Sequence, residues 1–339
     1  MSIGVPRWRH VSFSAPVRGA GETQMELHVI FGTGAVGTAT MQALIQRGKF
    51  VRMVNRSGKP SPSMGGDLPP NVEICAGDAY DVDQVRRLTE NAAVVYQAAQ
   101  PEYHEWAALF PPLQAAILAG TAANHAKLVV IENLYTYGDP HGAPLTEESS
   151  QQPHTRKGKI RLAMHESLMA AHRSGSVRVA VGRASDFYGP GYLLLGDQLF
   201  YPALAGKKAS GIGNLDVAHS FTYTGDVGRA LAILGERDEA LGQVWHIPSA
   251  PALTQRELIT KIFAETGFEP KISAINGLMM RLAGIVIPGA RETVEMMYEF
   301  KQPFVMDSSK FTDAFGMSAT PHADAVRATV AWFRAHPKS

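Results

Sequence analysis

The chain has 339 residues, of which 45% are hydrophobic and 19% are charged, and its 32 basic and 31 acidic side chains leave a formal net charge of +1. This balance excludes a strongly basic surface, so we expect neither nucleic acid nor a membrane as a partner. The single cysteine, Cys75, excludes a disulfide framework and a cysteine-rich zinc site. No run of about 18 apolar residues is present, and we therefore expect a cytoplasmic globular protein.

The N-terminal segment, residues 1–24, contains Arg7, Arg9 and Arg18. No continuous apolar stretch follows these arginines, as a secretory signal would require. We predict a flexible arm here, followed by a folded region that begins near Met25.

Short apolar runs alternate with helical patterns over residues 25–183. Strands are predicted at 27–31, 50–54, 72–76, 94–96, 128–131 and 177–181, and helices at 36–46, 81–89, 105–119 and 159–171. Such alternation predicts an α/β fold, a Rossmann doubly wound parallel sheet covered by helices on both faces.

The pattern is looser over residues 184–339. Helices are predicted at 255–266, 291–299 and 323–334, and a lone strand at 243–247 is expected to return to the sheet. We interpret this half as a smaller, mostly helical C-terminal cap that binds substrate, with some segments returning to the core.

A glycine-rich turn directly follows the first predicted strand and opens the first helix. Its residues are Gly32, Thr33, Gly34, Ala35, Val36 and Gly37, a G-x-G-x-x-G pattern. In this context the first glycine permits a tight turn, the second lets backbone approach a pyrophosphate, and the third allows close packing of helix and strand. The turn therefore predicts a dinucleotide site at a helix N-terminus.

The end of the second strand indicates which dinucleotide is bound. A site that prefers NAD places an acidic side chain here to bind the ribose 2′-hydroxyl, whereas this chain has Asn55 and Arg56. A guanidinium attracts a 2′-phosphate that a carboxylate would repel. We predict NADP as cofactor, with NAD less favoured.

Several motifs resemble the extended short-chain dehydrogenase/reductases, the superfamily of NAD-dependent epimerases and dehydratases. Besides the glycine turn, they are Gly77-Asp78-Ala79, Gln97-Ala98-Ala99, Tyr137-Gly138-Asp139-Pro140, Arg183 to Gly191 and Phe221 to Val227. The resemblance covers residues 25–334. It implies that Asp78, Ala79, Ala98 and Ala99 contact the cofactor, and that a homodimer forms.

The same resemblance exposes departures at the catalytic positions. Asn133 lies where the family has Ser or Thr, and the Tyr-x-x-x-Lys positions fall on Gly158 and Leu162, neither of which can transfer a proton. The chain is therefore similar to the atypical branch of the superfamily that lacks this motif. Lys159 is the neighbour that we suspect of replacing the missing lysine.

A further departure concerns the substrate. Asp186 replaces an asparagine that helps hold nucleotide sugars in the family, and a carboxylate there would repel a sugar diphosphate. Nucleotide-sugar epimerase chemistry is thus disfavoured. We expect Trp106, Asp186, Phe187 and Tyr192 to line a pocket for a small, fairly apolar compound.

Three residues are candidates for replacement chemistry. Tyr103 and His104 could supply a proton beside the Ala98-Ala99 segment, although Tyr103 could equally pack the start of the next helix. Asn133 could orient a substrate carbonyl, or could instead bond the local backbone. The twelve histidines form no metal-binding spacing, so no metal is expected.

These observations favour an enzyme that binds NADP(H) and acts on a carbonyl or hydroxyl group. Two alternatives stay open. One is an NADP(H)-sensing or scaffold protein without turnover, because the usual Tyr and Lys are lost. The other is a lyase, isomerase or epimerase on the same fold with a retained cofactor.

Overall fold

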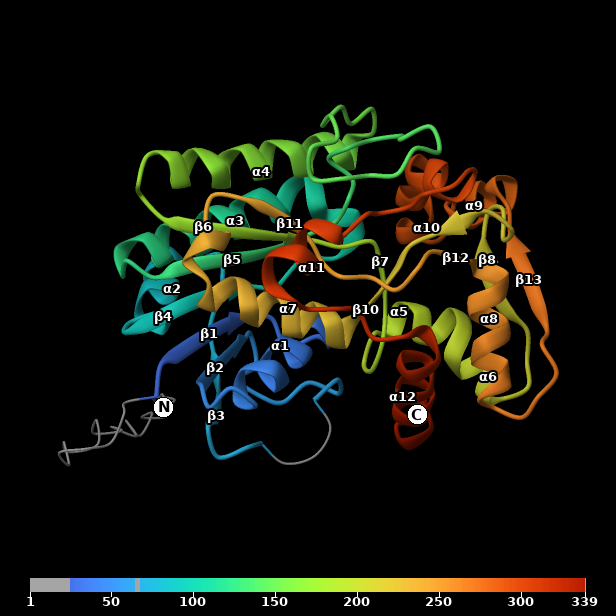
Figure 1. Cartoon of the computed structure of the whole chain (residues 1–339), viewed down its shortest axis with the longest axis horizontal. Helices are drawn as coiled ribbons and strands as arrows, with labels where there is room; N and C mark the ends of the chain where they lie inside the picture. Colours follow the sequence, from blue (N-terminus) through green and yellow to red (C-terminus); the bar gives the residue numbers. More distant parts are fainter. Residues whose placement is uncertain (1–24, 65–67, 339) are drawn as a thin grey trace, which may run out of the picture.

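The computed structural model describes residues 25–64 and 68–338, so the predicted N-terminal arm lies outside the described residues. A seven-stranded parallel sheet with the order β11-β6-β5-β4-β1-β2-β3 forms the centre of the protein (Figure 1). Its strands are β1 Leu27–Phe31, β2 Phe50–Asn55, β3 Val72–Ala76, β4 Ala92–Gln97, β5 Lys127–Glu132, β6 Arg178–Arg183 and β11 Val244–His246. The doubly wound sheet predicted from the alternation is confirmed, including the late strand that returns to it.

Helices cover both faces of this sheet because alternate strand residues point to opposite sides. Ile30 belongs to the hydrophobic cluster under α1 (Ala35–Ile45) and α7 (Thr224–Glu236). Its neighbours Val29 and Phe31 belong to the cluster on the opposite face. The helices of that face are α2 Val82–Leu88, α3 Trp106–Ala123 and α4 Arg156–Arg173.

Helix α3 has a high mean hydropathy, although its sequence is not an unbroken apolar run. Counted from Tyr103, it is the one helix among the described residues that is long and apolar enough to cross a membrane, with a mean hydropathy of 1.3. Phe110, Leu113 and Ile117 of this helix are nevertheless buried in the core cluster against the sheet. We therefore assign α3 as a core helix.

Helices α1 and α7 cross at very short range because α7 carries a glycine at the crossing. A Cβ atom built on Gly228 would overlap the backbone of Ala39 and Thr40. Gly228→Ala is expected to lower the free energy of unfolding by about 2 to 3 kcal/mol, since backbone cannot move aside as a side chain can. Gly277→Ala is the matched control, because nothing lies within 4 Å of its Cβ position. Chemical denaturation of both variants measures the difference, and equal stabilities would contradict this packing.

The cap contains more strand than expected. Three two-stranded sheets pair β7 Asp186–Tyr188 with β10 Phe221–Tyr223, β8 Ala209–Ile212 with β13 Ile272–Ile275, and β9 Ala218–His219 with β12 Leu253–Thr254. The main helices of this half are α6 Tyr201–Leu204, α8 Gln255–Ala264, α9 Gly277–Ala283, α10 Pro288–Thr293, α11 Ser309–Phe315 and α12 His322–Ala335. A short 3₁₀ helix, η4, spans Val294–Phe300.

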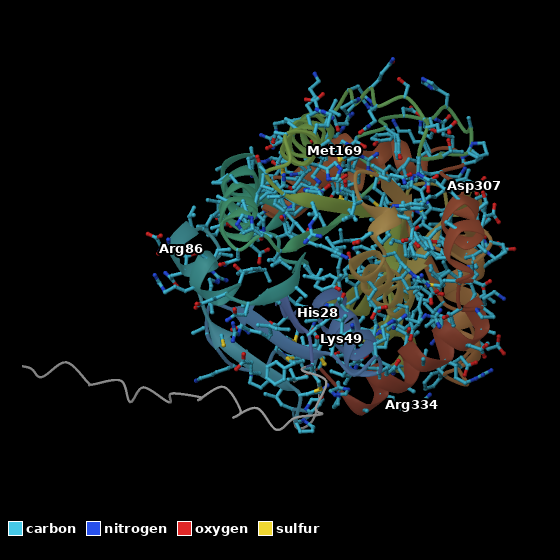
Figure 2. All side chains as sticks on the ribbon, turned by 60° about the vertical axis from the view of Figure 1, so that its left-hand side comes forward. His28, Lys49, Arg86, Met169, Asp307 and Arg334 are labelled. Carbon is cyan, nitrogen blue, oxygen red and sulfur yellow. The ribbon has the colours of Figure 1, made fainter. Side chains whose placement is uncertain are left out.

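The central sheet has one edge formed by the amino ends of its strands and one formed by their carboxyl ends, and these two edges differ in chemical character. At the amino ends of the strands, Lys49 forms ion pairs with Glu26 and Glu236, and His28 is bonded to Tyr96 (Figure 2). The charged groups at this end are thus largely paired with one another, although His28 Nε2 has no hydrogen-bond partner among the described residues. The carboxyl ends of the strands carry the glycine turn and most of the predicted site residues, which is where ligands bind in open α/β sheets.

Candidate functional site

The glycine turn has the geometry that a pyrophosphate requires. Gly32 has a φ angle of +109°, and a Cβ there would lie 2.7 Å from the Ala99 nitrogen. A Cβ on Gly37 would overlap the Gly32 carbonyl oxygen. Gly34 has nothing within 4 Å of its Cβ position, and no side chain caps α1. Open space thus faces free N–H groups at the start of α1, in the turn that also contains Thr33, Ala35 and Val36.

Asn55 organises the turn after β2. Its Nδ2 donates to Thr33 Oγ1 (3.0 Å) and to the Lys59 carbonyl (2.8 Å), and its Oδ1 accepts from the Ser57 and Gly58 amides. The side chain of Asn55 is therefore used inside the protein. Arg56, directly after it, is exposed and forms no ion pair among the described residues. Arg56 is thus free to bind an anion at the cofactor end of β2.

The remaining predicted cofactor residues follow β3 and β4 at the same edge. Asp78 is exposed and accepts a bond from the Tyr80 amide, with Ala79 beside it. Ala98 and Ala99 contact Gly32, and the Ala98 amide donates to the Phe31 carbonyl. The structure therefore brings these four residues to the edge that carries the glycine turn.

Two tyrosine hydroxyl groups meet beside this edge. Tyr103 Oη lies 3.2 Å from Tyr135 Oη. Trp106 packs edge-on against the Tyr103 ring at 5.0 Å, and its own Nε1 donates to the Pro101 carbonyl. Trp106 is only 4% exposed, so it positions Tyr103 within the core cluster. Burial raises the pKa of both tyrosines, and the carboxylates of Glu299 and Asp186 raise them further.

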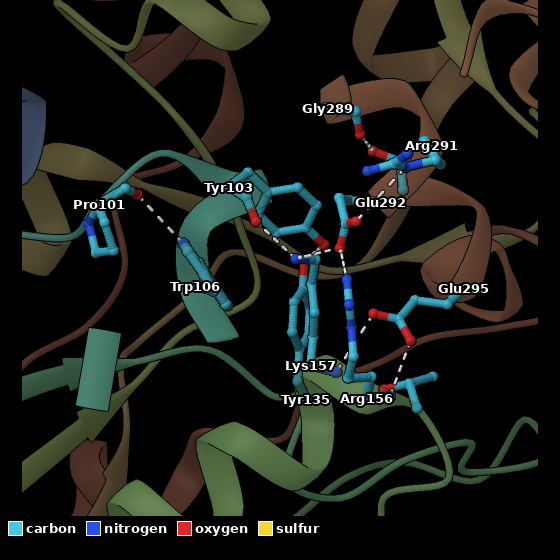
Figure 3. A network of polar contacts seen from close by, with 12 residues as sticks. Pro101, Tyr103, Trp106, Tyr135, Arg156, Lys157, Gly289, Arg291, Glu292 and Glu295 are labelled. Atoms are coloured by element: carbon cyan, nitrogen blue, oxygen red, sulfur yellow. Dashed lines mark hydrogen bonds and ion pairs between the residues drawn. The ribbon is translucent and has the colours of Figure 1, made fainter. Parts of the chain in front are cut away.

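Lys157 lies directly below Tyr103, as Figure 3 shows. Its Nζ donates to the Tyr103 carbonyl at 2.6 Å, lies 4.1 Å from the centre of the Tyr103 ring, and pairs with Glu292 of α10 at 2.9 Å. The side chain is buried, and desolvation lowers the pKa of its ammonium group. Lys157 thus links the tyrosine pair to the cap.

The start of α4 explains why the sequence pattern missed this lysine. Thr155 accepts a bond from the Gly158 amide and caps a helix that begins at Arg156, three residues before the predicted start. The buried pair with i, i+4 spacing is Lys157 and Arg161. Lys159, the suspected replacement, is exposed. The unfavourable basic start of α4 is offset by Glu292 and Glu295 of the cap, as Figure 3 shows.

A buried charge cluster lies below the site, where β5 ends. Glu132 pairs with Arg183 (2.9 Å), His165 (3.3 Å) and Arg161 (3.7 Å). Burial opposes the charge of Glu132, but Arg183, His165 and Arg161 outweigh it and lower the pKa of this carboxyl to about 2. Arg183 also donates to Gln151 and lies against the Tyr137 ring. This cluster anchors the strand that carries Asn133 and Tyr135.

The cap side of the site carries the predicted substrate residues. Asp186 on β7 forms a 3.0 Å hydrogen bond with His219, and the rings of Phe187 and Tyr192 meet edge to face at 5.7 Å. Burial raises the pKa of Tyr192, and the nearby charge of Asp186 adds to this effect. Asp186, Phe187 and Tyr192 therefore lie together.

Two of the predicted catalytic residues are placed differently from Tyr103. His104 is exposed in the short 3₁₀ turn Tyr103–Glu105 that precedes α3. Asn133 Oδ1 accepts a bond from the Tyr135 amide at 3.3 Å, which is the local backbone contact considered for it. Residues that sequence reasoning missed are Tyr135, Lys157, Arg161, His219 and Glu299. Among the described residues, no three His, Cys, Asp or Glu side chains gather as a metal site would require.

Comparison with known proteins shows the family to which the chain belongs. The sequence model of the NAD dependent epimerase/dehydratase family matches residues 29–247. The 2'-dehydrokanamycin reductase of Streptomyces kanamyceticus is 24% identical over 73% of this chain and 68% of its own length. An uncharacterised protein of Sinorhizobium fredii is 26% identical over 67% of this chain, and the match spans 63% of that relative.

Solved structures share the fold. The dTDP-glucose 4,6-dehydratase of Bacillus anthracis, in complex with NAD, has a TM-score of 0.76 at 16% identity over 91% of this chain and 97% of its own. The UDP-N-acetylglucosamine 4-epimerase of Bacillus cereus has a TM-score of 0.72 at 17% identity over 93% and 98% of the two chains. At these identities the likeness establishes the fold alone.

Proposed function

Because the chain belongs to the NAD dependent epimerase/dehydratase family, an enzyme family with an NAD(P) site, we propose that it is an NADP(H)-dependent oxidoreductase. It acts on a carbonyl or hydroxyl group of a small compound. The observation that carries this proposal is the hydroxyl pair of Tyr103 and Tyr135 at the edge that holds the glycine turn. We further propose a cytoplasmic location and a homodimer.

The residues at the carboxyl edge have separate roles in the proposed reaction. The backbone of the turn from Gly32 to Gly37 binds the pyrophosphate, and Arg56 binds the 2′-phosphate. NADP(H), when bound, supplies or accepts the hydride. The two tyrosine hydroxyls orient the substrate oxygen and donate a proton to it.

The tyrosine pKa values indicate in which form the two hydroxyls meet the substrate. Burial raises the pKa of Tyr103 and Tyr135 above the ordinary value of a phenol, so both hydroxyls stay protonated at neutral pH. Protonated phenols donate hydrogen bonds but are poor bases. The pair is therefore suited to orienting the substrate oxygen by hydrogen bonds in either direction of the reaction.

The predicted substrate residues combine aromatic and polar side chains. The rings of Phe187 and Tyr192 contact each other, and the charge of Asp186 acts on both Tyr192 and Tyr103. We propose a small substrate with one apolar face and one face rich in hydrogen-bond donors.

Arg56→Ala tests the choice of cofactor. Charge-assisted bonds contribute about 1.5 to 3 kcal/mol, so the Kd for NADPH is expected to rise roughly 10- to 100-fold while the Kd for NADH stays nearly constant. Fluorescence titration measures both constants. Arg237→Ala, an exposed arginine at the opposite edge, is the control. An equal loss of NADPH and NADH affinity would contradict a 2′-phosphate contact.

Epimerase or dehydratase chemistry with a retained cofactor is the second candidate, because solved neighbours bear those names. Such chemistry regenerates its cofactor in each cycle. Incubation of purified protein with labelled NADP separates the two candidates. Rapid exchange supports the oxidoreductase, whereas cofactor that does not exchange supports the second candidate.

A further inference from the structure

Glu299 occupies a buried position between two parts of the site. Its neighbour Tyr298 belongs to a hydrophobic cluster against which Tyr103 and Tyr135 pack. Its other neighbour, Phe300, stacks on the His219 ring at 5.3 Å, and His219 holds Asp186. Glu299 therefore lies between the hydroxyl pair and the Asp186–His219 pair.

The Glu299 carboxyl lies near the Tyr298 hydroxyl, and the Oη of that tyrosine is itself without a hydrogen-bond partner among the described residues. The Glu299 side chain is 2% exposed, and its Oε1 has no hydrogen-bond partner among the described residues. Burial raises the pKa of Glu299 well above its ordinary value, and the charge of Asp186 raises it further. His219, which is 1% exposed, likewise has an unpartnered Nδ1. An unsatisfied buried carboxyl is costly, so this arrangement calls for a ligand.

The nearby cations do not neutralise these two acids. The side chains of Arg156 and Lys157 are already paired with Glu292. In the part of the chain that the structure describes, neither Asp186 nor Glu299 forms an ion pair with a lysine or arginine. The charge of Asp186 therefore disfavours a phosphate or carboxylate ligand here and favours a cation, and a bound cation would in turn favour the ionised form of Glu299.

We propose that Asp186 and Glu299 recognise a protonated amine on the substrate. The substrate class is a cationic amino compound, such as an amino sugar or an aminocyclitol, whose reacting carbonyl or hydroxyl lies at Tyr103 and Tyr135. An ammonium group offers three donors and one positive charge, and so satisfies both carboxylates at once. This inference rests on the proposed function, because it names the substrate of the same site.

Binding of matched neutral and cationic probes tests the inference. The NADPH-saturated protein is titrated calorimetrically with glucosamine and 2-deoxystreptamine, and with the N-acetylated form of each. At least one amine is expected to bind about tenfold more tightly than its N-acetyl form, the value of a single charge-assisted bond. Equal affinities, or no amine binding below about 10 mM, would overturn the inference.

Substitutions locate the preference within the site. Glu299→Gln and Asp186→Asn keep the shape of the side chain and are each expected to abolish the amine preference. Glu269→Gln, which removes an exposed carboxylate elsewhere, should keep it. Thermal melting verifies folding, and Asp186, which is only half-buried, carries the test if Glu299→Gln does not fold. A preference that survives in a folded acid-site variant would overturn the assignment.

The NADPH fluorescence of the same samples separates this inference from the proposed function. Intact NADPH binding without an amine preference refutes the amine site alone. Loss of NADPH binding in the unmodified protein refutes the oxidoreductase itself.

Discussion

Glu132→Gln is expected to lower the free energy of unfolding by about 3 to 5 kcal/mol, because it leaves Arg161 and Arg183 buried without their anion. Urea denaturation at neutral pH measures the loss. Glu166→Gln on the exposed side of α4 is the matched control and should change stability by less than about 0.5 kcal/mol. Adding Arg161→Met to Glu132→Gln should restore part of the loss, since it removes one uncompensated charge. Equal stability of the two single variants would contradict the cluster.

The same cluster predicts a defined loss of stability in acid. The pKa of Glu132 is about 2 in the folded protein against 4.5 as its ordinary value. A carboxyl whose pKa is depressed by folding stabilises the protein fully above its unfolded pKa. This contribution is therefore present above about pH 4.5 and is lost as the pH falls through about 2. The Glu132→Gln variant should lack this part of the acid transition.

Tyr135→Phe is expected to reduce kcat for NADPH oxidation by about 10²- to 10⁴-fold, the usual contribution of a positioned acid. The assay uses the best carbonyl substrate of a broad panel. NADPH affinity should not change, because the hydroxyl pair lies on the substrate side of the turn. Tyr201→Phe is the control, since its hydroxyl bonds only the His336 carbonyl in the cap. A normal kcat in Tyr135→Phe would contradict the role of this hydroxyl as proton donor.

The strands and helices of the core could be predicted from the sequence because each one has a local sequence pattern. Each strand of the sheet is a short apolar run next to a helical pattern, and the turn from Gly32 to Gly37 carries its own steric requirements. The strands of the cap could not be predicted in the same way. Its strands are two to four residues long, as in Ala218–His219, and so show no periodicity.

The catalytic edge was only partly predictable, for two physical reasons. Loop length before α4 cannot be counted from a motif, so the suspected replacement was Lys159, two residues after the buried Lys157. Glu299 reaches the site only through the packing of η4 against His219, a contact between residues far apart in sequence. Tyr103, Asp186, Phe187 and Tyr192 were predicted because they follow recognisable segments.

Native mass spectrometry of the purified protein, with NADPH and NADH added in competition, tests the central claim most directly. We expect one dinucleotide per subunit and preferential binding of NADPH, because the turn binds the pyrophosphate and Arg56 binds the 2′-phosphate. Preference for NADH would contradict the role of Arg56. Failure to bind either dinucleotide would contradict the proposed oxidoreductase.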